Sequence, residues 1–107
     1  MIESLTLDSD YYPPLLRHIQ NPPLLLYVRG NKEVLTKDCL SVVGTRRHTD
    51  YGKRSVQDLV GPMARAGFAI VSGLALGIDA LAHQTALDEH APTIAVLGSG
   101  LSDAVMY

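Results

Sequence analysis

The sequence predicts an α/β fold built on an open parallel sheet with crossover helices. Three short apolar runs, residues 39–43, 68–71 and 93–97, are each followed by a glycine-bearing turn. A helical segment follows each of the first two turns, and this alternation is typical of parallel strands joined by helices. The runs are apolar almost throughout, which favours strands covered on both faces and hence a buried sheet. Cys39 begins the first run, so we expect a reduced, buried thiol.

A lead-in over residues 1–37 precedes this pattern and belongs to the same domain. Pro13-Pro14 can start a helix over residues 15–20, and Pro22-Pro23 must end it because proline lacks the amide donor. Residues 24–28 are predicted as a strand, with Gly30-Asn31 as its turn. Residues 38–107 then form the first half of the main domain.

Two helices are expected between the three runs. Thr49 can cap the first helix, which Gly67 ends, and Gly61-Pro62 predicts a kink or a break within it. The inward positions of this helix are Val56, Leu59, Val60 and Met63. The second helix ends near residues 88–90, and its inward stripe is Ile78, Leu81, Ala82, Thr85 and Ala86.

Composition excludes several classes of protein. The 107 residues carry a net charge of -2 and are 47% hydrophobic, values typical of an ordinary globular domain. The apolar runs are far shorter than the roughly 20 residues of a spanning helix, and no signal peptide opens the chain. One cysteine cannot form an internal disulfide. We expect a cytoplasmic protein without a membrane partner.

Charge is distributed unevenly along the chain. Residues 29–54 hold seven basic and three acidic side chains, a local balance of +4, and the remainder carries -6. A basic segment in an acidic chain is compatible with a local site for a polyanion.

The turns after the three runs are the candidate site, because the carboxyl ends of parallel strands share one edge of a sheet. Glycine lets a backbone amide approach a phosphate closely, hydroxyls add donors, and helix N-termini add partial positive charge. We therefore expect a ligand that carries phosphate. The expected contacts are Gly44, Thr45, Arg46, Arg47, Ser72, Gly73, Gly77, Gly98, Ser99 and Gly100.

The common nucleotide fingerprints are missing. A Walker A loop would need glycine five residues after Gly44 or Gly73, where Thr49 and Ile78 stand. The pattern G-x-G-x-x-G begins at Gly98 but has Asp103 at its third glycine. We expect no cofactor and assign no metal ligand and no catalytic residue.

Three further candidates have two interpretations each. Tyr51 can stack on a base, although a tyrosine near a helix start is more often packing. Asp79 and His83 lie four residues apart on one helix face, and we interpret them as a structural pair rather than an acid and base. Ser72 and Ser99 lack a nucleophile elbow and are interpreted as donors.

Five segments resemble the DNA-processing protein A family (DprA, also called Smf), in order and spacing, from Tyr12 to the last residue. They are YPPLL at 12–16, NPPLLLYVRGN at 21–31, VVGTRRHTDYG at 42–52, VSGLALGIDALAH at 71–83 and TIAVLGSG at 93–100.

The resemblance implies a Rossmann-like domain that binds single-stranded DNA without cleaving it. It also implies that the protein shields incoming DNA during natural transformation, helps to load the RecA recombinase and forms a homodimer at full length. Arg46 matches the family arginine that contacts DNA phosphate, and the turn at Gly44 and Thr45 lines the same pocket as Ser72-Gly73.

Two departures from the family pattern modify this expectation. Family members commonly carry a basic residue where this chain has Leu76. The chain also stops at Tyr107 inside a family motif, so we expect a fragment that associates with itself or is marginally stable.

Two other functions stay open from the sequence. One is a nucleotide-binding or nucleotide-hydrolysing enzyme related to the phosphoribohydrolases, although their Pro-Gly-Gly-x-Gly-Thr signature is missing. Asp79 and His83 would then have to supply catalysis. The other is a folding unit that binds nothing measurable by itself.

Overall fold

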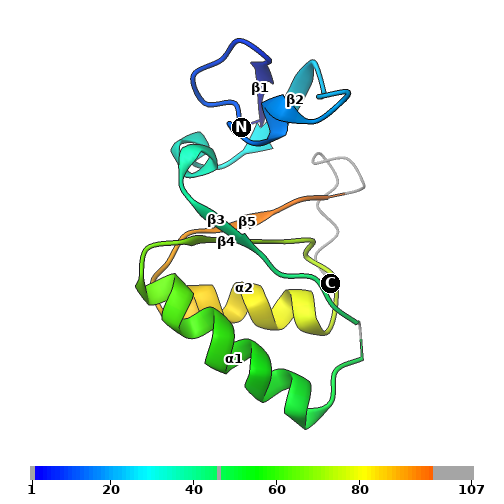
Figure 1. Ribbon diagram of the computed structural model, residues 1–107, viewed down its shortest axis with the longest axis vertical. Coiled ribbons are helices and arrows are strands. Elements are labelled where there is room, and N and C mark those ends of the chain that lie inside the picture. Colours follow the sequence, from blue (N-terminus) through cyan, green and yellow to red (C-terminus); the bar gives the residue numbers. More distant parts are fainter. Residues whose placement is uncertain (1, 46, 98–107) are drawn as a thin grey trace. The chain divides into compact units, whose positions relative to one another are not determined.

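The computed structural model describes residues 2–45 and 47–97. The chain divides into two compact units, which cover residues 2–37 and 38–97 of this described part. Each unit has its own sheet (Figure 1).

The first unit is an antiparallel two-stranded ribbon with two short helices. Strand β1 (Ile2–Thr6) pairs with β2 (Leu25–Arg29), so that Ser4 lies opposite Tyr27. The predicted strand after Pro23 is confirmed, whereas β1 was not predicted. The expected lead-in helix is wrong in its length: one 3-10 turn, η1 (Leu16–His18), replaces it. A second 3-10 helix, η2 (Lys32–Thr36), follows the turn at Gly30.

Tyr12 is the fully buried centre of the first unit. Its phenol donates a hydrogen bond of 2.7 Å to the Pro23 carbonyl. The Arg17 guanidinium lies 5.4 Å from the ring centre and donates to the carbonyls of Leu7 and Ser9. These bonds fix the irregular segment between β1 and β2, which explains why prolines and polar residues form a stable structure here.

The second unit is the predicted α/β half-domain. Its parallel sheet has the order β3 (Cys39–Ser41), β4 (Ala69–Ser72), β5 (Thr93–Ala95). Helix α1 (Asp50–Arg65) connects β3 to β4, and α2 (Ile78–Asp88) connects β4 to β5. The register aligns Leu40 with Ile70 and Ile70 with Thr93.

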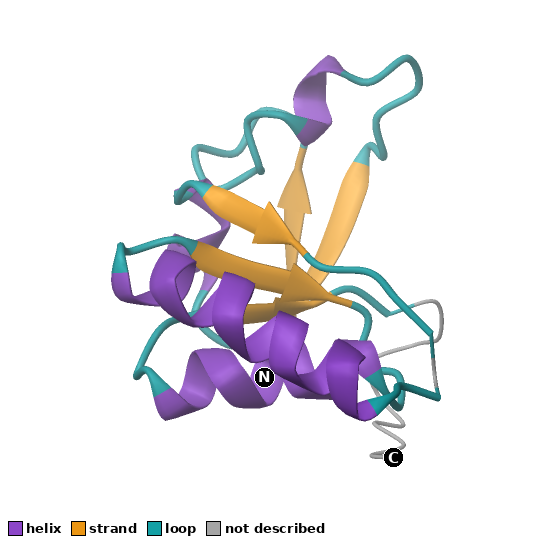
Figure 2. Ribbon diagram, turned by 60° about the horizontal axis from the view of Figure 1, so that its bottom comes forward, coloured by secondary structure: helices purple, strands orange, loops and turns teal. Residues whose placement is uncertain are grey.

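Both helices of this unit cover the same face of the sheet (Figures 1 and 2). Two crossovers of the same hand that step in one direction place their helices on one side. The expected burial on both faces is confirmed for the central strand β4, where the successive residues Ala69 and Ile70 are both fully buried. The residues of β3 and β5 are partly or largely exposed. The core between helices and sheet contains Val56, Val60, Ala64, Ile70, Ala82 and Ala86.

Three expectations about single residues are corrected. Cys39 is exposed, because β3 is at the edge of the described sheet and Cys39 alternates with Leu40, which packs on the core. Leu59 is 70% exposed, and Ala64 packs in the core instead. Helix α1 is not broken at Pro62, which is exposed and lies in the last turn, where the carbonyl it leaves unbonded can reach water.

Candidate nucleic-acid interface

Two of the predicted turns meet at the carboxyl edge of the parallel sheet. The residues after β3 and β4 enclose a shallow cavity of about 250 Å³. Its lining is Ser41, Val42, Val43, Val71, Ser72, Gly73, Asp79 and Val96. Val96 follows β5, and its amide donates to the Ser72 carbonyl at 2.9 Å. All three strands therefore contribute to one hollow.

The turn after β3 is fixed on the start of α2. A Cβ atom at Gly44 would lie 2.6 Å from the Cβ, Cγ1 and Cγ2 atoms of Ile78, so no side chain fits there. The Ile78 amide donates to the Thr45 carbonyl at 3.0 Å. Glycine at position 44 is thus required by the contact between this turn and α2.

The same turn leads into α1 through a chain of local hydrogen bonds. The Arg47 amide donates to Thr45 Oγ1 at 3.2 Å, and the Gly52 amide donates to Thr49 Oγ1 at 3.0 Å. Thr49 is the N-cap of α1, as predicted. A hydroxyl that accepts one bond can also donate one, so the Thr45 hydroxyl is chemically able to donate to a ligand.

Basic side chains surround this turn in the sequence, and those that the structure describes are exposed. Arg47, Lys53 and Arg54 are exposed and belong to the turn or the first residues of α1. Asp50 is the acidic residue in the first turn of that helix. The region is therefore electropositive and accessible to a polyanion.

Ser72 and Gly73 use their donors inside the protein. The Ser72 hydroxyl, 6% exposed, donates to the Val42 carbonyl at 2.7 Å. The Gly73 amide donates to Asp79 Oδ2 at 3.0 Å. The expectation that these two groups donate to phosphate is not met by these contacts, because both hydrogens already have acceptors. A carboxylate at the first turn of α2 also offsets the positive end of that helix.

Asp79 and His83 are a buried pair that holds the loop at residues 73–77. His83 Nε2 accepts a hydrogen bond of 3.2 Å from the Leu74 amide, and Nδ1 lies 2.7 Å from Thr93 Oγ1. Burial lowers the pKa of the His83 imidazole, and the nearby Asp79 charge opposes that shift. The pair is placed to stabilise the loop.

The backbone of this loop is strained at one residue and depends on glycine at another. Leu74 has a φ of +54°, which is uncommon for a residue with a side chain. Gly77 has a φ of +79° and is the N-cap of α2. Leu76 is 56% exposed, so the position where the family often has a basic residue presents an apolar side chain to solvent.

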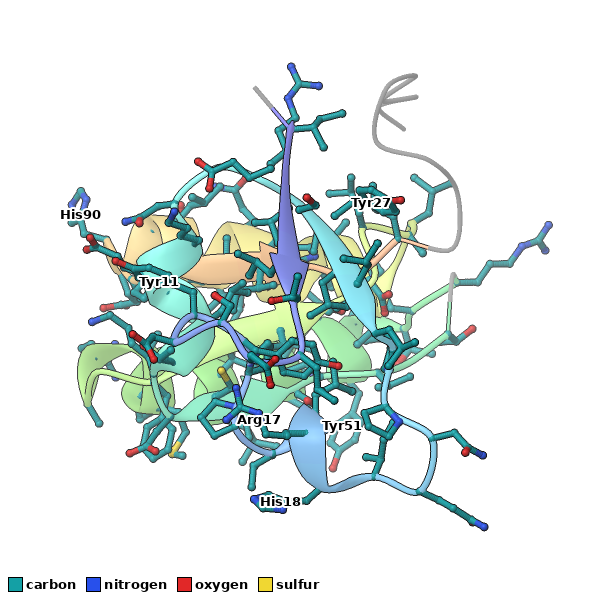
Figure 3. The ribbon with its side chains drawn as sticks, turned by 90° about the horizontal axis from the view of Figure 1, so that it is seen from above. Tyr11, Arg17, His18, Tyr27, Tyr51 and His90 are labelled. Carbon is teal, nitrogen blue, oxygen red and sulfur yellow. The ribbon has the colours of Figure 1, made fainter. Side chains whose placement is uncertain are left out.

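Tyr51, labelled in Figure 3, is 75% exposed. It lines a second hollow of about 420 Å³ between β3 and α1. The lining of this hollow is largely apolar and includes Val43, Ser55, Leu59 and Ile78. An exposed phenol ring beside the basic turn is available for stacking on a base.

Four predicted contacts, Arg46, Gly98, Ser99 and Gly100, lie outside the described residues. Sequence reasoning missed Ile78, Leu74 and Thr93. Ile78 excludes a side chain at position 44, and the other two bond His83. Thr93 was already within a predicted strand, and the alternation along that strand could have placed its hydroxyl toward α2. Within the described ranges, no group of histidine, cysteine or acidic side chains could hold a metal ion.

A parallel α/β unit with glycine turns and basic residues at the carboxyl edge of its sheet defines a Rossmann-like half-domain. The family model described as "DNA recombination-mediator protein A" matches residues 3–106, and the chain belongs to this family.

The chain is similar to the DNA processing protein DprA of Bacillus subtilis, with 38% identity over 100 residues that cover 92% of this chain and 34% of that protein. The X-ray structure of DprA from Streptococcus pneumoniae superimposes with a TM-score of 0.89 at 38% identity, over 97% of this chain and 36% of the other. A structure of DNA processing protein A from Helicobacter pylori, which concerns its single-stranded DNA binding mode, superimposes with a TM-score of 0.71 at 31% identity. The match covers 91% of this chain and 42% of the other.

The chain therefore spans about a third of the Bacillus relative and of the Streptococcus structure. Among the described helices, none combines the length and the apolar character needed to cross a membrane.

Proposed function

We propose that the chain binds single-stranded DNA through the sugar-phosphate backbone and does not cleave it. The observation that carries this proposal is the turn after β3, which presents Gly44, Thr45 and Arg47 at the carboxyl edge and is fixed there by the Ile78 amide. Arg46 stands between Thr45 and Arg47 in the sequence. Two adjacent arginines next to the bonded Thr45 suit a repeated anionic backbone rather than one base.

The contacts found at the sheet edge narrow the proposed site. Gly44, Thr45, Arg46 and Arg47 form its centre, and Gly98, Ser99 and Gly100 remain proposed contacts from the third turn. We assign Ser72, Gly73 and Gly77 to the structure of the neighbouring loop. The Ser72 hydroxyl donates to the Val42 carbonyl and the Gly73 amide donates to the Asp79 carboxylate. Tyr51 would stack on a base beside the phosphates.

Relatives support DNA rather than a mononucleotide as the ligand. The matching family model is described as a recombination mediator, and the Helicobacter structure concerns the single-stranded DNA binding mode of that protein. Stacking and backbone contacts of this kind tolerate any sequence, because every nucleotide offers the same phosphate and a π-face.

The hydrogen bonds of Asp79 and His83 support a non-enzymatic role. An acid or base for nucleotide hydrolysis must reach the substrate. The Asp79 carboxylate accepts the Gly73 amide, and both imidazole nitrogens of His83 have protein partners. Among the described residues, Asp79 and His83 were the candidates for catalysis in the phosphoribohydrolase-like alternative. Their hydrogen bonds suit a structural role better than a catalytic one.

For the whole protein we propose the wider role implied by its family. The protein would act in the cytoplasm, shield incoming single strands during natural transformation and pass them to the RecA recombinase. It would do so as a homodimer. Binding of RecA can be tested by pull-down and by strand-exchange assays in which single-strand binding protein blocks RecA.

Fluorescence anisotropy with labelled oligonucleotides tests DNA binding. We expect the chain to bind oligonucleotides of several sequences with similar affinity, and Arg46→Ala to weaken binding to all of them by a similar factor. Equal binding by Arg46→Ala and the parent would contradict the role of Arg46.

Arg65→Gln is the matched control, since it removes one positive charge at the far end of α1. Arg65 forms an exposed ion pair with Glu89, 2.8 Å between Nη1 and Oε1, whose loss costs at most about 1 kcal/mol. If Arg65→Gln weakened binding as much as Arg46→Ala, the effect would be one of net charge and not of the proposed site.

A further inference from the structure

We propose that His83 is a positioning residue for the loop at residues 73–77, and that it holds this loop only as a neutral imidazole with its hydrogen on Nδ1. This inference rests on the proposed function, because the loop borders the turn to which we assign DNA phosphate. The proposal concerns which nitrogen carries the hydrogen, and the partners of His83 determine it.

The hydrogen-bond directions follow from chemistry. A backbone amide can only donate, so Nε2, which faces the Leu74 amide at 3.2 Å, must be an acceptor without a hydrogen. A neutral ring then has its hydrogen on Nδ1, which donates to Thr93 Oγ1 at 2.7 Å. Thr93 Oγ1 in turn donates to the Ile70 carbonyl at 2.9 Å. Each group in this series of hydrogen bonds is thus assigned consistently as a donor or an acceptor.

The loop needs this support because its backbone is in an uncommon conformation. Leu74 is at φ +54°, and a residue with a side chain keeps such a conformation where neighbouring contacts enforce it. Two contacts from α2 do so: Asp79 accepts the Gly73 amide and His83 accepts the Leu74 amide. The loop then passes through Gly77 into α2, where Ile78 contacts Gly44 and Thr45.

Few charges act on the imidazole. Asp79, four residues earlier on α2, is the acidic group that interacts with it. Strand β4, the loop at 73–77 and strand β5 contain no ionisable side chain. Helix α1 packs on α2, but its charged residues are all exposed, namely Asp50, Lys53, Arg54, Asp58 and Arg65. His83 itself is 7% exposed.

Protonation therefore acts directly on the loop. A second hydrogen on Nε2 would face the Leu74 amide, so two donors would meet and that bond would break. The loop then loses one of its two anchors from α2, and the support of the neighbouring turn weakens. Binding that needs the ordered loop falls with the fraction of molecules in which the loop is formed.

Nuclear magnetic resonance tests the tautomer without any DNA. Nitrogen-15 shifts of His83 should show a protonated Nδ1 and an unprotonated Nε2 at pH 8, and Leu74 amide exchange should be slow and accelerate as the imidazole gains its proton. A hydrogen on Nε2 at pH 8, or an exchange rate at Leu74 that ignores His83 protonation, would overturn the inference even if DNA binds.

Two variants connect the tautomer to binding. His83→Gln places a carbonyl acceptor near the Nε2 position and does not titrate, whereas His83→Ala removes the acceptor. We expect His83→Gln to match the parent at pH 8 and to bind more tightly than the parent below pH 6.5, by up to about tenfold per pH unit. His83→Ala should bind weakly throughout, and circular dichroism checks that it folds.

Comparison of parent and His83→Gln at each pH cancels any effect of pH that does not act through residue 83. Identical pH profiles for the two proteins would overturn the inference while leaving the proposed function intact. Absence of DNA binding by the parent at every pH would contradict the proposed function, and the resonance experiment would still decide the role of His83.

Discussion

Gly44 and Ile78 touch so closely that a single added carbon would overlap three side-chain atoms of Ile78 at 2.6 Å. One of these is the Ile78 Cβ, which the α2 backbone holds, so rotation of the side chain cannot relieve the overlap. The glycine that the sequence suggested for phosphate approach is thus also a packing requirement between the first turn and the second helix.

Gly44→Ala should accordingly destabilise the protein by about 1–3 kcal/mol, the usual cost of forced overpacking. Urea unfolding followed by circular dichroism measures the change. Gly52→Ala is the matched control, because its added carbon would find its nearest neighbour at 3.5 Å. Similar stabilities for the two variants would show that the turn can move away from α2 at little cost.

Gly61→Ala, in contrast to Gly44→Ala, should increase the stability of the protein. Gly61 lies within α1, and the added carbon would meet Arg65 Nη1 at 3.5 Å and Thr85 Cγ2 at 3.9 Å, which are ordinary contacts. Alanine is favoured over glycine inside a helix by about 0.5–1 kcal/mol. Thermal unfolding should show a higher midpoint, and a lower one would mean that α1 and α2 pack more tightly than these distances indicate.

Thr49→Ala tests the cap that joins the basic turn to α1. Loss of the bond from the Gly52 amide to Thr49 Oγ1, 3.0 Å long, should cost about 1 kcal/mol. Thr49→Ser keeps the acceptor and should retain most of the stability. Equal denaturation midpoints for the alanine and serine variants would show that the cap does not contribute to stability.

Stability should depend on pH through His83. Its pKa is lowered in the folded chain, so the unfolded chain binds more protons in this range and stability rises with pH. The contribution is complete above the ordinary pKa of 6.5 and declines as pH falls below it. His83→Gln should flatten this part of the profile, which urea unfolding at a series of pH values measures. An unchanged slope in His83→Gln would contradict the assignment.

The sequence predicted the parallel half-domain well because its signals are local. Apolar runs, the Thr49 cap and the inward stripe of α2 each follow from neighbouring residues, and the structure confirms them. The exposure of Cys39 and Leu59 depends on which strand is at the edge and how the helices are distributed, which is information about the whole sheet. The strand β1 could not be predicted, since it is stabilised by pairing with residues 19 to 27 positions away.

The candidate site could also be predicted only in part from the sequence. That two glycine turns would meet at one edge follows from the topology of parallel strands, and the hydrogen bonds across them agree. Which donors remain available does not follow from residue types. Ser72 and Gly73 are suitable for phosphate by composition, but Val42 and Asp79 take their hydrogens, and only the folded geometry decides this.

The salt dependence of single-stranded DNA binding tests the central claim most directly. If Arg46 and Arg47 contact phosphate, log affinity should fall linearly with log salt, and each alanine variant should reduce the slope by about 0.7. The double variant should lose both increments, and Arg65→Gln should keep the parent slope. A parent affinity that does not respond to salt, or equal slopes for the parent and the double variant, would contradict a phosphate site at this turn.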